Sequence, residues 1–205
     1  MIKRFIIKII AFCLVSINAN AIENVILFGD SLMAGYGLPQ KKHLAIVLQK
    51  NLNESGYNLE VIDGSVSGST SASGLNRAEW SLSEPNINLM ILGLGANDML
   101  RGISPVETEK NLEKIIQIAK QKKIDVILAG MIAPTTHGFF YKKNFDNIYP
   151  NLAKKYDLDL IPFLLEGVAL KAELNLDDGM HPNEKGTLII SKTLQKIILE
   201  KISNY

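Results

Sequence analysis

Cysteine is almost missing from this sequence, since Cys13 is the only one in 205 residues. It lies in an N-terminal segment that we expect to be removed, so the mature chain would have neither a disulfide nor a cysteine nucleophile. A chain without thiols suits an oxidising compartment such as a periplasm.

An excess of basic charge is also missing. The first 21 residues carry three of the 22 basic side chains and none of the 21 acidic ones, so the rest has 19 basic against 21 acidic side chains. This near-neutral balance, without a basic stripe, gives no electrostatic reason to expect nucleic acid or an anionic membrane as the main partner.

The longest N-terminal apolar run, from Phe5 to Val15, is interrupted by Lys8. A membrane-spanning helix needs about 20 apolar residues, so the run is too short to serve as a stable anchor. Lys3 and Arg4 precede it, and Ala19-Asn20-Ala21 supplies small residues spaced for cleavage. These features predict a secretory signal peptide over residues 1–21, cleaved near Ala21, and a periplasmic or secreted product without a membrane span.

Residues 22–205 have the length of one ordinary domain. They contain no internal repeat, low-complexity segment or linker-like stretch. We therefore expect one domain, and nothing in the sequence requires more than a monomer.

Continuous apolar runs alternate with helical patterns along this domain. Such runs indicate strands buried on both faces of a parallel sheet, because a sheet with one solvated face would show alternating polarity. We therefore predict an α/β fold, a three-layer α/β/α sandwich with about five parallel strands. The runs are Val25–Phe28, Leu59–Ile62, Ile87–Leu94, Ile124–Ala129 and Leu158–Ile161.

Two helices are predicted most clearly. The segment Ser104–Lys122 has Pro105 and Glu107 near its start, where proline and acidic side chains are favourable, and then one apolar stripe. A last helix is expected from about Asn183 to Ser203, directly after a His-Pro pair.

The most informative loop follows the first predicted strand, where Gly29-Asp30-Ser31-Leu32 places a serine at a strand-to-helix turn. A serine there is exposed and lies beside unpaired backbone amides that can stabilise an anion. Taken alone, the tripeptide is equally compatible with a helix cap formed by Asp30 or Ser31.

Three other loops carry matching chemistry. The second strand is followed by small residues from Asp63 to Thr70, and the third is followed by Asn97, whose side-chain amide is a hydrogen-bond donor. Ahead of the last helix, Asp178 precedes His181 by three residues, a spacing that lets the carboxylate bind one imidazole nitrogen and leave the other free.

Together these loops contain every part of a serine hydrolase: a nucleophile, its base, a group that orients the base, and donors for the oxyanion. In an open parallel sheet the residues after each strand gather at one edge, where ligands bind. We therefore interpret the four loops as one active site.

The stretches around Gly29-Asp30-Ser31-Leu32, Gly68, Gly95-Ala96-Asn97-Asp98 and Asp178-Gly179-Met180-His181 resemble the four sequence blocks of the GDSL or SGNH hydrolases. From Val25 to the last helix, the chain is similar to the bacterial periplasmic thioesterase, lysophospholipase and arylesterase group.

This resemblance implies a flavodoxin-like fold, no metal and no cofactor. It implies that Ser31 attacks, that His181 is the general base and then acid, and that Asp178 orients His181. The Ser31 amide, the Gly68 amide and the Asn97 side chain would form the oxyanion hole.

Met99, Leu100 and Arg101 are expected to contact substrate, because the 99–104 loop aligns with a segment that moves over the acyl chain in similar enzymes. The chain departs from the family pattern at Ala96, where a second glycine is common, and this methyl group is expected to narrow the acyl site. Further candidates for an acyl groove, or equally for ordinary packing, are Tyr36, Trp80, Phe139 and Phe140.

The expected substrate is a small acyl ester, a thioester or a lysophospholipid. Two alternatives remain open at this point: a carbohydrate O-deacetylase with the same serine machinery, and a non-catalytic module of the cell envelope that binds lipid or peptidoglycan. The sequence does not decide between acetyl and longer acyl chains.

Overall fold

The computed structural model describes residues 22–203. The predicted signal peptide lies outside the described residues. The described chain forms one five-stranded sheet in the order β2-β1-β3-β4-β5, and every pair of neighbouring strands is parallel. The strands are β1 (Asn24–Gly29), β2 (Glu60–Asp63), β3 (Ile87–Gly93), β4 (Asp125–Ala129) and β5 (Asp159–Ile161).

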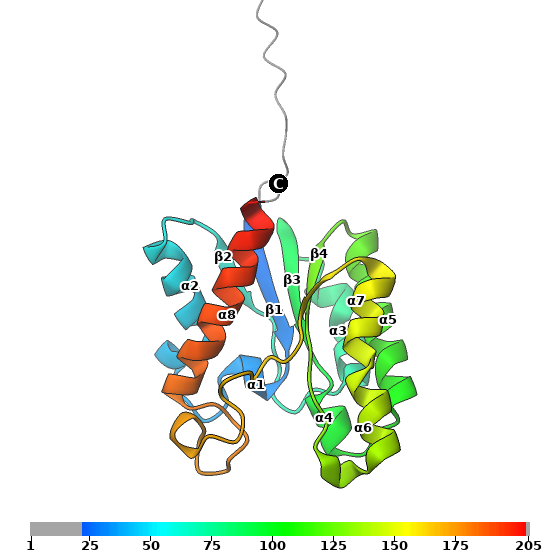
Figure 1. The fold of residues 1–205 in the computed structure, drawn as a ribbon. Helices are drawn as coiled ribbons and strands as arrows, with labels where there is room; N and C mark the ends of the chain where they lie inside the picture. Colours follow the sequence, from blue (N-terminus) through cyan, green and yellow to red (C-terminus); the bar gives the residue numbers. More distant parts are fainter. Residues whose placement is uncertain (1–21, 204–205) are drawn as a thin grey trace, which may run out of the picture.

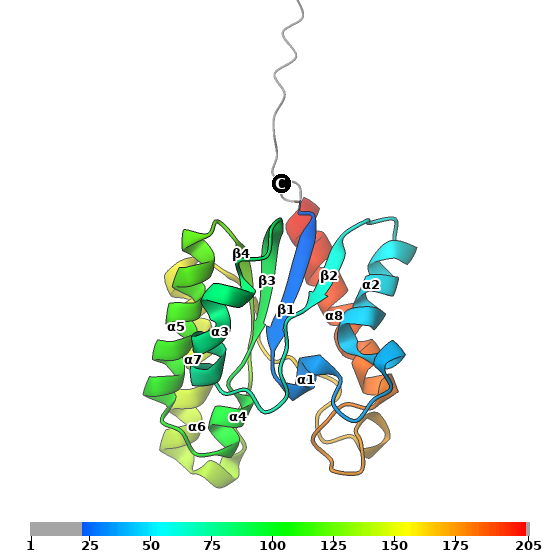
Figure 2. The ribbon, with the colours of Figure 1, turned by 180° about the vertical axis from the view of Figure 1, so that it is seen from behind.

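Helices cover both faces of this sheet. In both views α2 and α8 lie on one side, and α3, α5 and α7 lie on the other (Figures 1 and 2). The short helices α1, α4 and α6 lie toward the carboxyl edge of the sheet (Figure 1). The α-helices are α1 (Ser31–Ala34), α2 (Leu44–Glu54), α3 (Ser71–Ser81), α4 (Ala96–Leu100), α5 (Pro105–Gln121), α6 (Phe139–Asp146), α7 (Ile148–Tyr156) and α8 (Glu184–Ser203). Three 3₁₀ turns are η1 (Gln40–Lys42), η2 (Thr135–His137) and η3 (Ala172–Leu174).

This architecture confirms the predicted α/β sandwich with a parallel sheet, and its strand order is that of flavodoxin-like folds. The runs of β1, β3 and β4 become strands because their side chains are buried between two helical layers, whereas the edge strands β2 and β5 are only partly buried. The predicted boundaries differ by no more than one residue; β2, for example, begins at Glu60 and ends at Asp63.

The pairing of β1 with β3 prepares the site. The two strands run in register from Val25↔Leu89 to Gly29↔Gly93, so both end at the same level of the sheet. The chain crosses to β2 on one side of β1 and to β3 on the other, which makes the β1/β3 edge the topological switch point where ligands bind in such folds.

The two predicted helices are present. Helix α5 runs over Pro105–Gln121, with Ser104 and Lys122 as its caps, and α8 runs over Glu184–Ser203. Among residues 22–203, no helix combines the length and hydropathy that crossing a membrane requires.

Candidate active site

Ser31 stands at the first position of α1, directly beyond the end of β1. Asp30 caps this helix, and its Oδ1 accepts a hydrogen bond from the Leu32 amide at 3.0 Å. The first amides of a helix have no intrahelical acceptor, so the Ser31 N–H is open to an external one. The serine is half-buried, with its hydroxyl facing the loop that precedes α8.

A continuous hydrogen-bond chain links Ser31 to His181 and Asp178. The distance from Ser31 Oγ to His181 Nε2 is 3.0 Å, and that from His181 Nδ1 to Asp178 Oδ2 is 2.7 Å. Tyr36 packs on the imidazole, with the ring centroids 4.4 Å apart. The structure thus joins Ser31 to the predicted pair Asp178 and His181 in the order that nucleophilic catalysis requires, although Ser31 and His181 are 150 positions apart in the chain.

The Asp178 carboxylate is held in its ionised form by its own loop. Its Oδ1 accepts from the backbone amides of His181 and Met180, each at 2.9 Å. These two amide donors, followed by the His181 side chain, lower the pKa of Asp178 to about 2. An ionised carboxylate on Nδ1 keeps the imidazole oriented and leaves Nε2 for the serine proton.

Asn97 reaches the same space from the start of α4, after β3. Its Nδ2 donates to Asp30 Oδ2 at 3.2 Å, so the asparagine is tied to the residue that precedes the serine. Asp30 itself is 1% exposed, and burial raises the pKa of its carboxyl to about 6 against the lowering effect of the Leu32 and Asn97 donors.

Gly68 lies in the loop between β2 and α3, which is fastened to the end of β1. The Gly64 amide donates to Leu27 O at 3.0 Å and the Val66 amide donates to Gly29 O at 3.1 Å. Gly68 has a φ of +79°, in the left-handed region, and its amide donates to no group within residues 22–203. The amide is therefore open to a ligand beside the nucleophile loop.

Arg77 holds these two loops together from α3. Its guanidinium donates to Gly64 O at 2.6 Å and to Gly29 O at 3.0 Å, and it lies 3.8 Å from the centroid of the Phe28 ring. This role of Arg77 was not predicted, because an arginine within a helical segment is most often on a solvated face.

A cavity of about 440 Å³ opens beside the serine, within the range of small-molecule sites, about 300–1,000 Å³. Its lining is mostly apolar, and Ser31, Asn97, Asn175 and His181 contribute its polar side chains. Such a cavity suits an acyl chain whose carbonyl reaches the serine. The apolar lining residues are Leu32, Ala96, Met99, Leu100, Met131, Ile132, Pro134, Phe163, Leu165, Ala169, Leu170 and Met180.

The three residues expected to contact substrate lie in different places. Met99 and Leu100 line the cavity, as does Ala96. Arg101 does not line it; its guanidinium donates to Gly68 O at 3.1 Å and so joins α4 to the loop that carries Gly68.

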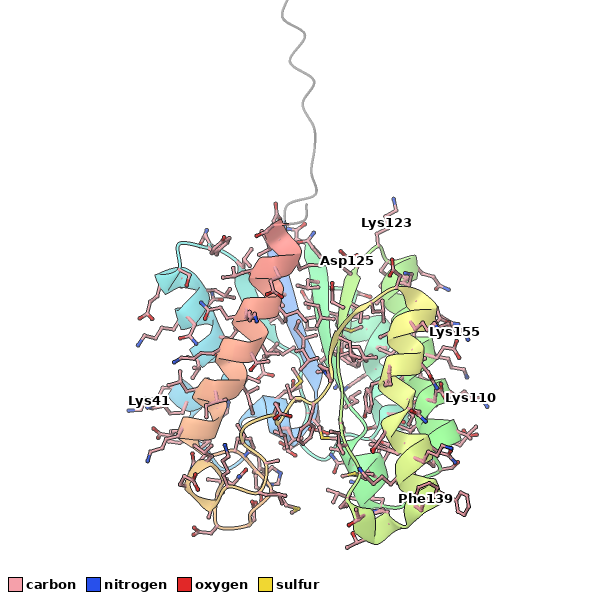
Figure 3. All side chains as sticks on the ribbon, viewed as in Figure 1. Lys41, Lys110, Lys123, Asp125, Phe139 and Lys155 are labelled. Carbon is pink, nitrogen blue, oxygen red and sulfur yellow. The ribbon has the colours of Figure 1, made fainter. Side chains whose placement is uncertain are left out.

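The aromatic candidates lie outside the cavity. Trp80 on α3 is 79% exposed, and Phe139 and Phe140 begin α6 with their rings in solvent. Figure 3 shows Phe139 pointing away from the molecule. The sequence does not distinguish an aromatic side chain that lines an acyl groove from one that is exposed to solvent. The distinction requires the fold.

The cavity residues that follow β4 and β5 were not predicted from the sequence. Met131 follows β4, while Phe163, Leu165 and Leu170 follow β5. Ser31 and Asn97 were predicted because ligands bind beyond the carboxyl ends of strands. The same rule applies to these positions, but an apolar residue after a strand does not by its type indicate a binding site.

The two other histidines of the chain, and the aspartate that follows Asn97, have structural partners. His43 Nε2 lies 3.1 Å from Leu38 O, and His137 Nε2 lies 3.0 Å from Met99 O. Asp98 is fully buried and accepts from the Ser71 amide at 2.7 Å. Within residues 22–203, no group of three or more His, Cys, Asp or Glu side chains is arranged to hold a metal ion.

Comparison with known proteins identifies the family of this chain. Residues 27–188 match the GDSL-like Lipase/Acylhydrolase family. The chain is 38% identical over 179 residues to an arylesterase of Vibrio mimicus, covering 87% of this chain and 89% of that protein. It is 34% identical over 183 residues to thioesterase 1/protease 1/lysophospholipase L1 of Escherichia coli K12, covering 89% and 86%.

A solved structure extends the agreement to the fold. The crystal structure of TesA superimposes with a TM-score of 0.82 at 32% identity, covering 88% of this chain and 99% of that one. Because the family match spans most of the chain, this protein belongs to the GDSL-like lipase/acylhydrolase family and is a GDSL-type carboxylic ester hydrolase.

Proposed function

We propose that Ser31, His181 and Asp178 are the catalytic triad of this esterase. The observation that carries the proposal is the unbroken chain of hydrogen bonds from Ser31 Oγ through His181 to Asp178, at 3.0 and 2.7 Å. His181 Nε2 takes the Ser31 proton as the hydroxyl attacks the acyl carbonyl, and the ionised Asp178 stabilises the imidazolium that forms.

The developing negative charge on the carbonyl oxygen needs donors that are already in place. The amides of Ser31 and Gly68 and the Nδ2 of Asn97 are the groups available beside the nucleophile, and we assign them to the oxyanion hole. Collapse of the tetrahedral intermediate expels the alcohol or thiol, protonated by His181, and leaves an acyl group on Ser31. Water activated by His181 then releases the acid.

The acyl chain would occupy the cavity lined by Met99, Leu100 and the loops after β4 and β5. Its apolar lining favours fatty acyl esters, including lysophospholipids, over acetylated sugars, whose hydroxyl groups need hydrogen-bonding partners. We propose that the protein acts as a monomer in the periplasm or outside the cell, after cleavage near Ala21.

Hydrolysis of p-nitrophenyl esters from two to twelve carbons, beside an acetylated sugar and a lysophospholipid, tests this assignment. We expect Ser31→Ala to abolish activity and fluorophosphonate labelling, while Ser83→Ala, a change at an exposed serine of the surface, retains both. Preference for longer acyl chains supports the acyl-cavity assignment, and a clear preference for the sugar overturns it.

Asn97→Ala tests the oxyanion hole. Loss of one such donor typically lowers turnover by about 10²–10³, and we expect a decrease of that order in kcat. Unchanged turnover would remove Asn97 from the hole.

A further inference from the structure

Asp30 is a buried ionisable group that the triad does not use. It is 1% exposed and takes part in no ion pair within the described part of the chain. A buried carboxylate without a cationic partner is unfavourable, whereas a neutral serine or asparagine would cap α1 equally well. Helix capping alone therefore does not explain a carboxylate at this position.

The two carboxylate oxygens have different partners. Oδ1 accepts from the Leu32 amide at 3.0 Å and Oδ2 accepts from Asn97 Nδ2 at 3.2 Å. The second contact joins the residue before the nucleophile to a side chain from the end of β3, across the switch point of the sheet.

A carboxylate restricts the asparagine in a way that a neutral group does not. The oxygen and nitrogen ends of a side-chain amide have nearly the same shape and exchange by rotation about χ2. An ionised carboxylate only accepts hydrogen bonds, so it requires the Nδ2 end of Asn97 to face it. One N–H then points to Asp30, and the other remains available to the substrate oxygen.

We propose that Asp30 is a positioning residue that fixes the amide orientation of Asn97, so that Nδ2, and not Oδ1, faces the oxyanion. This inference rests on the proposed assignment of Asn97 to the oxyanion hole. Without the carboxylate, the flipped amide would present its carbonyl oxygen to the developing negative charge.

The neighbouring aspartate does not serve this purpose. Asp98 directs its oxygens to the Ser71 amide and hydroxyl and to the Thr108 hydroxyl, at 2.7, 2.5 and 3.3 Å. Of these two carboxylates, only that of Asp30 accepts a hydrogen bond from the Asn97 side chain.

A double-mutant cycle in the full chain separates positioning from a general structural role. Asp30→Asn keeps an acceptor for the Leu32 amide and removes the charge. We expect kcat on a p-nitrophenyl ester to fall about tenfold, less than the loss of a whole oxyanion donor, with KM within about twofold. In the Asn97→Ala background, the same change should alter kcat by less than about twofold.

Asp63→Asn is the matched control, because Asp63 Oδ1 also accepts from the amide two residues ahead, that of Ser65 at 3.1 Å, but Asp63 makes no hydrogen bond to Asn97. It should leave kcat unchanged. Losses that multiply in the double variant, or an unchanged kcat in Asp30→Asn, overturn the inference while the triad stands. An Asn97→Ala protein with full activity overturns the oxyanion assignment itself, and the inference with it.

A second measurement leaves Asp30 intact. The pKa of Asp30 is measured by following its carboxyl ¹³C signal by NMR as the pH is varied, in the wild-type and Asn97→Ala proteins. The titratable groups that face the Asp30 carboxyl are His181, Asp98 and Tyr149. Removal of an amide donor should raise the pKa of Asp30. An unchanged pKa would mean that the hydrogen bond does not form in solution and would overturn the inference.

Discussion

The pKa values of two aspartates beside Ser31 are shifted in opposite directions by their immediate surroundings. Asp178 accepts hydrogen bonds from two backbone amides and from the His181 side chain, which lower its pKa to about 2, so it is ionised at neutral pH. Asp30 has fewer donors and is buried, which raises its pKa to about 6. Residue type alone does not distinguish the two, because both are carboxylates that follow or precede glycine in loops.

The raised pKa of Asp30 predicts a stability cost. A carboxyl with a higher pKa in the folded state than in the unfolded state destabilises the fold when ionised, above about pH 6, and this cost disappears as the pH falls toward 3.8. Asp30→Asn should therefore raise the free energy of unfolding at pH 8, by up to about 3 kcal/mol, and by less at pH 5.

Urea unfolding at the two pH values measures this effect, with exposed Asp63→Asn as the control that should show no such gain. Lower stability of Asp30→Asn at pH 8 would contradict the prediction. Greater stability together with lower kcat would show a carboxylate retained for activity.

At the scale of elements, the turn from β3 into α4 depends on one glycine. Gly95 has a φ of +117°, and a Cβ at this position would collide with the Tyr149 hydroxyl, which donates to Leu94 O at 2.9 Å. The turn delivers Asn97, so its backbone and the packing of α7 are linked.

Gly95→Ala should destabilise the fold by about 3 kcal/mol or more, because it adds a steric clash to backbone strain. Gly56→Ala is the matched control, since Gly56 also has a positive φ of +85° but no atom within 4 Å of its added Cβ. It should cost only about 1 kcal/mol. Equal losses in urea unfolding would show that the contact with Tyr149 is unimportant.

The loop after β5 contributes to the lining of the cavity beside Ser31. Leu170 is 97% exposed and has a φ of +64°, two unfavourable features for a leucine, and it lines the cavity. An acyl chain that covers this side chain would account for its exposure.

Leu170→Ser should lower kcat/KM for a dodecanoyl ester about fivefold and leave the acetyl ester unchanged. The estimate corresponds to about 40 Å² of lost apolar contact at about 25 cal/mol/Å². Leu188→Ser, at a half-exposed leucine of α8 away from the cavity, is the control. A uniform decrease for both esters would contradict a role in chain binding.

For the whole molecule, the fold begins directly after the expected cleavage site. Ile22 is buried, and the amides of Glu23 and Asn24 both donate to Asn88 Oδ1, at 2.8 and 3.2 Å. Cleavage after Ala21 would thus leave every residue of the sheet in place.

We expect N-terminal sequencing of the exported protein to begin at Ile22. Replacing Ala19 and Ala21 by leucine should block processing, because the cleavage site requires small residues, whereas Ala11→Leu within the apolar run should not. An unprocessed, active protein in the cytoplasm would contradict the assignment.

The sequence by itself determined the layers of this protein and the chemical parts of its site. Continuous apolar runs require burial on both faces, so the parallel sheet and its helical layers could be predicted, and Ser31, Gly68, Asn97, Asp178 and His181 stand at strand ends or in the last loop. Helical segments were expected between the strands, but the bounds of α3 and α6 were not predicted, since their sequences lack a clear apolar stripe.

Only the tertiary structure decided which groups touch. The hydrogen bonds of Arg77 to Gly29 and Gly64, of Arg101 to Gly68, and of Asp30 to Asn97 join segments that are 13 to 67 residues apart. The apolar wall of the cavity is assembled from several loops in the same way. Contacts of this kind depend on strand order and register, which bring strand ends together in space and which no local sequence pattern encodes.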